Sequence, residues 1–374
     1  MAKKPVQYHE GGFPPERLDW DLLVPLVGPA NGALARYDGT LAALPNAAVL
    51  LSPLMTQEAV LSSRIEGTQS TMAEVLEFEA GIRPKVPDEN HTADIHEVLN
   101  YRKSMSRAVE LLKELPLCQR VIREAHSILM EGVRGQGKAP GEYRKIPNWI
   151  GPPGSPIEKA TYVPVSSDKL HSAMSRWENF IHENAPDKLV QLALLHAEFE
   201  ALHPFLDGNG RLGRMFVPLF LFSTGLLRGP MFYISAYLEA RRDIYYERLL
   251  AVSREGDWTG WCVFFLEALT EQAKENQQKA MSILKLYERE RDRIINLTRS
   301  QYAIKALDFL FMRPIFQTSA FVLEADIPEH TAKKMIKKLR DSGLFRVLRQ
   351  AKGRESMVVV FRDLLNITEG REVF

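Results

Sequence analysis

The stretch LHPFLDGNGRLGRMF, residues 202–216, places polar residues of catalytic type directly before an apolar run. Gly208, Asn209 and Gly210 lie at its centre. The permissive backbone of glycine lets consecutive N–H groups converge on one anion. The apolar run predicts a buried helix over 211–222, whose N-terminal N–H groups and dipole also favour a phosphate. The stretch therefore predicts a phosphate-binding loop that is held in place by a buried helix.

Charged residues in the same stretch sharpen this prediction. Arg211 and Arg214 are three residues apart and share one face of the first helical turn. Two guanidinium groups suit a polyphosphate better than a single phosphate. Asp207 would repel that ligand unless a cation lies between them, which predicts Mg²⁺ at Asp207. His203 is then available as a general base.

The alternative interpretation is structural. A histidine near a helix end is usually a packing residue, and Asp-Gly-Asn-Gly is often only a turn. However, Arg211 and Arg214 would be costly neighbours of an apolar helix without an anion.

Three segments resemble the Fic (filamentation induced by cAMP) family. HPFLDGNGRLGR (203–214) matches the Fic motif, His-x-Phe-x-Asp/Glu-Gly-Asn-Gly-Arg-x-x-Arg, at every specified position. PGEYRKIPNWIG (140–151) is similar to the family's flap, and SSRIEG (62–67) to its inhibitory motif, Ser/Thr-x-x-x-Glu-Gly/Asn. The resemblance covers roughly residues 40–270. It implies a mainly α-helical fold, a Fic-type helical bundle with a small β-hairpin flap.

The resemblance also implies a protein adenylyltransferase, which moves AMP from ATP to a Ser, Thr or Tyr hydroxyl of a target protein or of the chain itself. ATP and Mg²⁺ would be required. His203 would deprotonate the hydroxyl, and Asp207 would bind magnesium between the α- and β-phosphates. Arg211 and Arg214 would bind the outer phosphates, with Arg214 on the γ-phosphate.

Further residues enter the site through the same resemblance. Gly208, Asn209 and Gly210 would hold the phosphates. From its own chemistry, and not from the resemblance, we expect Phe205 to anchor this loop in the core. The target peptide would add as a strand at the flap. Tyr245 falls where the family places an adenine-site aromatic, and Ser253 where it often has an asparagine. The flap residues concerned are Ile150 and Gly151.

Glu66 has two interpretations. Without the family it is an ordinary exposed glutamate near a helix end. The inhibitory motif, Ser62 to Gly67, instead implies an ion pair between Glu66 and Arg214 that occupies the guanidinium needed by the γ-phosphate. We then expect an auto-inhibited wild type that the Glu66→Gly substitution activates. Glu66 could also orient a water for the reverse reaction, the removal of AMP.

Composition and organisation limit the remaining possibilities. The chain has 374 residues, a net charge of +1 and two cysteines in unrelated contexts. The charge argues against whole-chain affinity for nucleic acid or membrane, and no apolar run is long enough to span a bilayer. We expect a cytoplasmic protein with an irregular arm over 1–20 and helices from about residue 41. The expected domains are an N-terminal helical region (1–115), a Fic core (116–272), a linker helix (273–300) and a C-terminal domain (301–374). A homodimer is compatible with the sequence, which identifies no interface.

The C-terminal domain has the element order of a winged helix-turn-helix. Residues 333–354 contain nine Lys or Arg and one acidic residue, Asp341. Such a basic helix and wing fit DNA contacts through residues 318–354, although lysine-rich faces are often only solvated. The alternative function is a DNA-binding transcription regulator that uses the Fic site as a nucleotide-responsive switch.

Overall fold

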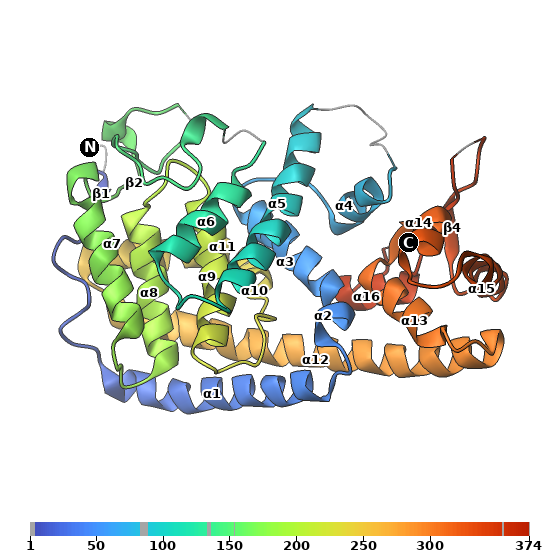
Figure 1. The fold of residues 1–374 in the computed structure, drawn as a ribbon. Helices are drawn as coiled ribbons and strands as arrows, with labels where there is room; N and C mark the ends of the chain where they lie inside the picture. The colour runs from blue at the N-terminus through green and yellow to red at the C-terminus, as the bar shows by residue number, and fades with distance from the viewer. Residues whose placement is uncertain (1–3, 83–88, 133–135, 153, 354, 374) are drawn as a thin grey trace. The chain divides into compact units, whose positions relative to one another are not determined.

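The computed structural model describes residues 4–82, 89–132, 136–152, 154–353 and 355–373. The fold is mainly α-helical, as predicted (Figure 1). It divides into two compact units, 1–38, 61–67 and 99–274 in the first, and 39–60, 68–98 and 275–374 in the second. Four helices contribute residues to both units: α1 (Trp20–Ala43), α3 (Ser52–Ile65), α5 (Glu89–Leu111) and α12 (Trp258–Thr298). The domain boundaries expected from the sequence stay predictions.

Helix α1 begins about twenty residues earlier than we expected. Pro25 and Pro29 lie inside it, and each proline removes one helical N–H donor. Burial offsets that loss, because α1 turns one apolar face inward within the first unit. Its buried residues there are Leu23, Ala30, Ala33, Leu34 and Tyr37. Burying a large apolar side chain stabilises by about 1.5–3 kcal/mol, so the tertiary contacts outweigh the local preference.

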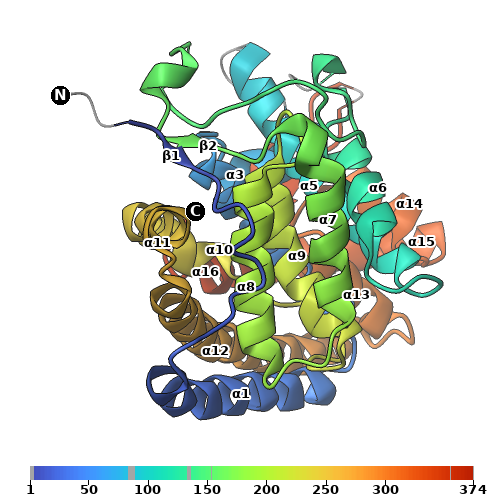
Figure 2. The same cartoon turned by 90° about the vertical axis from the view of Figure 1, so that its left-hand side faces the viewer.

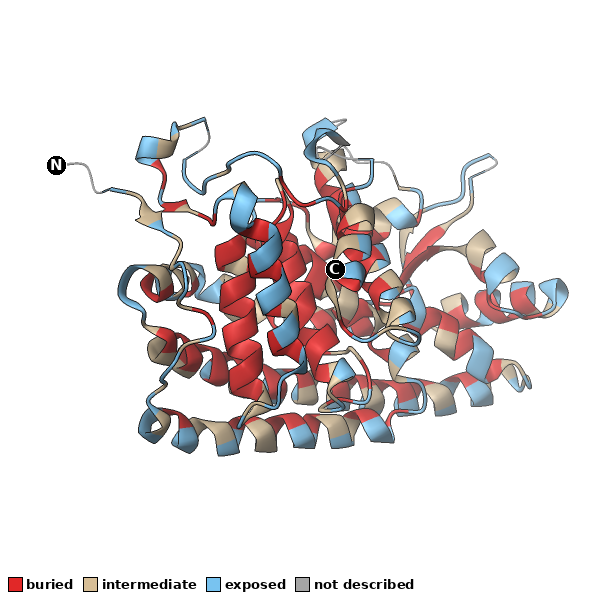
Figure 3. Ribbon diagram, turned by 60° about the vertical axis from the view of Figure 1, so that its left-hand side comes forward, coloured by how far each residue is buried: buried red, intermediate tan, exposed pale blue. Residues whose placement is uncertain are grey.

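The first unit is built around helix α8 (Lys188–Leu202), which packs against α7 (Ser167–His182) and α9 (Asn209–Ser223) (Figure 2). Helix α8 is buried over nearly all of its length, and α9 is buried from Asn209 to Leu221 (Figure 3). A helix that is apolar on all sides belongs in a core. The other helices of this unit are α6 (Gln119–Leu129), α10 (Ser235–Ala240), α11 (Arg242–Glu255) and the 3₁₀ turns η1 (Gln136–Lys138) and η2 (Ile157–Lys159).

A small sheet lies beside these helices. Strand β1 (Val6–Gln7) pairs in parallel with β2 (Tyr162–Val163), and Ile150 forms a single antiparallel bridge to Tyr162. Among the described residues, the hairpin expected in the flap is thus reduced to one bridge, because the prolines of this segment cannot donate to a ladder. They include Pro147, Pro152, Pro156 and Pro164. The arm over 1–20 was expected to be irregular, yet it supplies the outer strand.

The second unit contains α2 (Ala47–Leu50), α4 (Met72–Glu79) and the C-terminal elements. These are α13 (Ala303–Met312), β3 (Ile315–Gln317), α14 (Thr318–Glu324), α15 (Glu329–Asp341), β4 (Arg346–Arg349), β5 (Val358–Val360) and α16 (Arg362–Glu369). The strands form an antiparallel sheet in the order β3-β5-β4. Helix α12 continues through the charged stretch to Thr298, which covers most of the residues where a linker helix is expected. Among the described residues, no helix combines the length and apolarity needed to cross a bilayer.

Candidate active site

His203 occupies the C-terminal end of α8 in a left-handed conformation, with φ of 46° and ψ of 59°. Such a backbone is strained for a residue other than glycine, by roughly 1–2 kcal/mol. Arg144 holds it there. The buried guanidinium donates from Nε to the His203 carbonyl (2.9 Å) and from Nη2 to the carbonyls of Leu202 (3.2 Å) and Val165. A cation at a helix C-terminus also complements the helix dipole.

The loop after His203 is closed by Asn209. The side-chain oxygen of Asn209 accepts from the Phe205 N–H (2.8 Å), and its amide donates to the Phe205 carbonyl (2.9 Å). The Phe205 ring is fully buried and stacks on His126, with centroids 3.7 Å apart. The side chains of Phe205 and Asn209 therefore stabilise the loop from within and do not line the cavity.

His126 was not singled out from the sequence. Its Nδ1 accepts from the Gly141 N–H (2.8 Å), so its Nε2 is the protonated nitrogen and donates to the Asp207 carbonyl (3.0 Å). Burial lowers the pKa of His126 to about 4, which keeps the ring neutral. One neutral histidine thereby ties the predicted phosphate-binding loop to the start of the flap.

A cavity of about 510 Å³ opens beside this loop in the first unit. That volume is in the range of small-molecule sites. Its lining residues are Glu66, Trp149, Ile150, Gly151, Thr161, Tyr162, Ala197, Glu200, Ala201, His203, Gly210, Arg214, Tyr246, Leu249 and Leu250. The cavity thus brings together the predicted base, the second motif arginine, the glutamate of the predicted inhibitory motif and both predicted flap residues.

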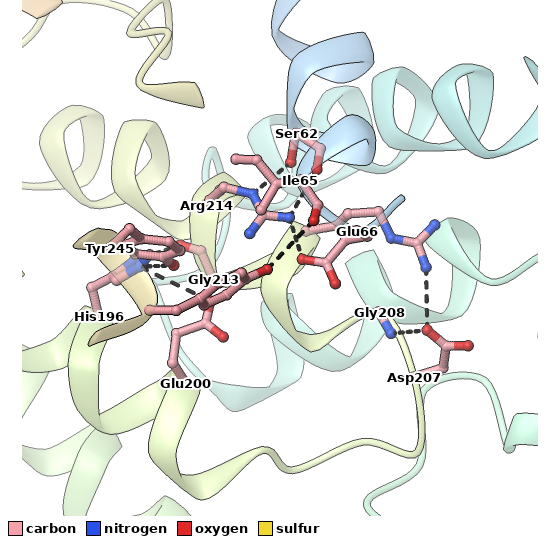
Figure 4. Close-up of polar contacts among 12 residues, drawn as sticks. Ser62, Ile65, Glu66, His196, Glu200, Asp207, Gly208, Gly213, Arg214 and Tyr245 are labelled. Atoms are coloured by element: carbon pink, nitrogen blue, oxygen red, sulfur yellow. Dashed lines mark hydrogen bonds and ion pairs between the residues drawn. The ribbon is translucent and has the colours of Figure 1, made fainter. Parts of the chain in front are cut away.

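Arg214 is the most enclosed charge in the cavity, with 1% of its side chain exposed. Its Nη2 donates to Glu66 Oε1 (2.6 Å) and to the Ser62 carbonyl (2.9 Å), while its Nε donates to the Ser62 hydroxyl (3.0 Å) (Figure 4). Burial opposes ionisation of Glu66, but the Arg214 guanidinium holds its pKa below the usual value. The predicted inhibitory motif ends at Gly67, whose φ of +107° lies outside the range of most L-residues.

The Glu66 carboxylate lies directly over the first turn of α9. A Cβ atom added at Gly210 would come within 2.2 Å of Glu66 Oε1 and 3.0 Å of Arg214 Nη1. This is the place where the backbone permits an anion to approach the helix N-terminus. The carboxylate therefore occupies the position that the sequence predicts for a phosphate.

Asp207 lies at the more open end of the loop, with 43% of its side chain exposed. Its Oδ1 accepts from the Gly208 N–H (2.6 Å) and lies 3.4 Å from Nη2 of the nearly buried Arg211. Within the described residues, no cluster of three His, Cys, Asp or Glu side chains could hold a metal ion. A single carboxylate fits magnesium, which takes most of its oxygen ligands from water and phosphates.

His203 lines the cavity as a neutral imidazole. Burial lowers its pKa to about 4, although the Glu66 carboxylate favours the charged form. A neutral ring is the form that a general base requires, although a pKa this low makes His203 a weaker proton acceptor than an ordinary histidine.

Two residues that were expected to contact the adenine ring of the nucleotide, Tyr245 and Ser253, are not part of the cavity lining. Tyr245 is fully buried, and its hydroxyl is 3.0 Å from His196 Nε2. The next residue, Tyr246, lines the cavity instead, because neighbours on a helix are about 100° apart. Ser253 Oγ lies 2.7 Å from His9 Nδ1 and 3.4 Å from the Tyr162 hydroxyl.

Sequence reasoning also missed Glu200, which lines the cavity three residues before His203. That spacing puts both residues on one face of α8 and would have found Glu200. Arg144 and His126 act through contacts with residues about 60 and 80 positions away, for which the sequence carries no local signal.

The fold and the site together define a Fic-type helical protein. Residues 24–110 match the family model "Fic/DOC family N-terminal", and residues 116–221 match "Fic/DOC family". A curated relative, "Protein adenylyltransferase Fic" of Drosophila grimshawi, is 26% identical over 203 residues, which is 52% of this chain but only 37% of that relative. The chain belongs to the Fic family.

Solved structures show the same fold. A Fic family protein from Desulfovibrio desulfuricans has a TM-score of 0.58 at 18% identity, covering 93% of this chain and 98% of that one. A Fic domain-containing signalling protein from Bacteroides thetaiotaomicron has a TM-score of 0.54 at 18% identity, covering 69% and 97%.

Proposed function

We propose that this protein is an adenylyltransferase that moves AMP from ATP to a protein hydroxyl and that Glu66 inhibits it. One observation carries the proposal: a single cavity is lined by His203, Arg214 and the flap residue Ile150, and Glu66 forms an ion pair with Arg214 inside it. The names of the curated relatives, which are protein adenylyltransferases, support the same reaction.

In this mechanism His203 takes the proton of the target hydroxyl. The hydroxyl oxygen forms a bond to the α-phosphorus of ATP, the bond from that phosphorus to the bridging oxygen breaks, and pyrophosphate leaves. The Arg144 contacts fix the His203 backbone, so little reorganisation accompanies the proton transfer.

The phosphates would lie over the first turn of α9. The N–H groups around Gly208 and Gly210 and the guanidinium groups of Arg211 and Arg214 would stabilise the charge that develops on them. Magnesium held by Asp207 would supply further neutralisation of the phosphate oxygens.

Glu66 inhibits by occupying the same guanidinium. A γ-phosphate cannot reach Arg214 along α9 while the Glu66 carboxylate is 2.6 Å from Nη2. Removing the carboxylate leaves the enclosed Arg214 charge without its partner, which raises its affinity for a phosphate anion.

The flap supports target binding by strand addition. Both main-chain groups of Ile150 are already bonded to the neighbouring strand, through Tyr162 O (2.9 Å), Thr161 N (2.8 Å) and Tyr162 N (3.1 Å). In an extended strand the main-chain groups of flanking residues point to the opposite edge. An incoming peptide would therefore pair with Trp149 and Gly151, both of which line the cavity.

Intact-mass spectrometry tests this function on wild type, Glu66→Gly and Glu66→Gly/His203→Ala, each incubated with ATP and magnesium. We expect AMP adducts on Glu66→Gly and on neither of the others. Adding a cell extract and labelled ATP extends the assay to outside targets. Equal labelling by all three proteins, or labelling by none in either format, would contradict the proposal.

We infer a second, separate function, DNA binding, from the surface of α15. Lys333, Lys334, Lys337 and Lys338 are exposed, whereas Ala332, Met335, Ile336 and Leu339 are buried. The basic residues Arg346, Arg349 and Lys352 follow on β4 and the adjoining turn, and Arg354 lies outside the described residues. A basic exposed helix face fits DNA phosphates.

Duplex DNA binding by the full chain, measured at several salt concentrations, tests this second function. We expect affinity that falls steeply with salt and that is lost in Lys333→Gln/Lys334→Gln/Lys337→Gln. Loss of binding should leave AMP transfer intact. Absence of binding at low salt would exclude the second function.

A further inference from the structure

Glu200 places a second carboxyl group in the cavity. It projects from the last turn of α8, and 12% of its side chain is exposed. Its Oε1 is buried and has no hydrogen-bond partner in the described part of the chain. A buried polar atom without a partner is destabilising, so its retention at a ligand cavity points to a ligand that supplies the partner.

Two glycines of α9 accommodate the two carboxyl groups. A Cβ atom at Gly210 would lie 2.2 Å from Glu66 Oε1, and one at Gly213 would lie 2.3 Å from Glu200 Oε1. Residues three apart share a helix face, so both carboxyl groups lie along the same side of α9. The Glu66 carboxylate lies against Gly210 in the first turn of α9, and the Glu200 carboxyl group lies against Gly213 further along the helix.

The surroundings of Glu200 favour its neutral form. Burial raises its pKa to about 7, Arg214 and the Tyr245 hydroxyl oppose this shift, and the negative charge of Glu66 adds to it. His196 Nε2 is 3.9 Å away, but burial keeps that imidazole neutral by lowering its pKa to about 3. The phenols of Tyr245 and Tyr246 are further titratable neighbours, and burial raises the pKa of both above the usual value.

We propose, resting on the nucleotide transfer proposed above, that Glu200 belongs to the nucleotide site and meets the outer phosphate of ATP as a neutral carboxylic acid. Its O–H donates a hydrogen bond to a phosphate oxygen, which an ionised carboxylate cannot do. The phosphate replaces the Glu66 carboxylate beside Arg214 and brings more negative charge with it. Glu200 therefore takes up a proton from solvent as ATP binds, and no bond within ATP changes.

Calorimetry of ATP binding in buffers of different ionisation enthalpy measures this proton. The Glu66→Gly protein with magnesium at pH 8 should take up nearly one proton per ATP, because most of Glu200 is ionised before binding. Its affinity should fall by up to about tenfold per pH unit above pH 8. Glu66→Gly/Glu200→Gln should take up no proton, and its affinity should not depend on pH in this range.

Two further variants guard against misfolding and general effects. Gly213→Ala in the Glu66→Gly background displaces the Glu200 carboxyl without changing its chemistry, and it should reduce both proton uptake and affinity. Glu198→Gln removes a buried carboxylate from the same helix outside the cavity lining, and proton uptake should remain.

Failure of this inference differs from failure of the proposed function. If Glu66→Gly binds ATP with the same proton uptake whether residue 200 is Glu or Gln, or with no uptake, the role of Glu200 is wrong while nucleotide transfer stands. If Glu66→Gly binds no ATP, both proposals fall.

Discussion

The phosphate loop and the flap face the same cavity, but they are held in opposite ways. The loop over 203–209 is held by hydrogen bonds with the side chains of Arg144, Asn209 and His126, all three of which are buried. The flap is joined to its sheet by one bridge at Ile150, and it exposes Ile146 and Trp149. Rigid support suits the groups that perform the chemistry, whereas a lightly held edge can adjust to a peptide.

The largest expected effect comes from removing the proposed general base, His203, which lies in the rigidly held loop. His203→Ala in the Glu66→Gly background should lower the rate of AMP transfer by about 10²–10⁴-fold, since a positioned base contributes that much. ATP affinity should be nearly unchanged, because the phosphates are held by α9. Quenched-flow labelling gives the rate, and calorimetry gives the affinity. A loss of affinity that accounts for the whole loss of rate would contradict the role of a base.

Acid should disrupt the buried side before the flap. Burial lowers the pKa of His126, His196 and His203 to about 4, 3 and 4. Below about pH 6.5 the unfolded chain binds protons that the folded chain does not. The free energy of unfolding therefore decreases by about 1.4 kcal/mol for each such histidine per unit by which the pH is lowered. The loss should continue to about pH 4, where the folded protein also becomes protonated.

Glu200 affects the pH dependence of stability in the opposite direction to the three histidines. Its raised pKa, about 7, adds stability that is lost as pH rises from about 4.5 through 7. Urea unfolding at several pH values in wild type and His126→Gln measures the balance. The variant should be less stable near neutrality and less sensitive to acid. An identical slope in both proteins would show that His126 is not held neutral.

Arg144 tests how the two regions are connected. It starts in the flap segment and donates to the Leu202 and His203 carbonyls at the end of α8 and to the Val165 carbonyl ahead of α7. Arg144→Met keeps the apolar stem but leaves those carbonyls without a charged donor, which should cost about 2–3 kcal/mol of stability. Transfer should fall because the left-handed backbone of His203 loses its support. Equal stability of Arg144→Met and wild type in urea unfolding would contradict this.

Most of the rigid region could be predicted from the sequence, because its information is local. The spacing of Gly208, Gly210, Arg211 and Arg214 indicates a phosphate site at a helix start, and the inhibitory motif predicts the ion pair from Glu66 to Arg214 that the structure contains. The resemblance to the Fic family added the roles of these residues.

The remainder depends on contacts that local patterns do not encode. Helix α1 forms despite two prolines because its buried face outweighs them. Strand β1 is two residues long, and it lies beside β2 because Tyr8 and His9 bind the buried Glu198 at 2.7 and 2.8 Å. Tyr245 is buried whereas the next residue, Tyr246, lines the cavity, and the sequence alone does not distinguish these two neighbouring positions.

The smallest expected effect on AMP transfer comes from changing the flap, which is joined to its sheet by the bridge at Ile150. Ile150→Pro removes the N–H that donates to Tyr162 O, whereas Ile150→Ala keeps the main chain and trims a side chain that is already partly exposed. In the Glu66→Gly background, the proline variant should lose about tenfold in transfer to a protein target, the equivalent of one hydrogen bond. The alanine variant should stay close to its parent. Both should bind ATP normally, because the loop over 203–209 is held independently of this bridge. If proline and alanine reduce transfer equally, the flap acts through the Ile150 side chain, and strand addition at its edge is excluded.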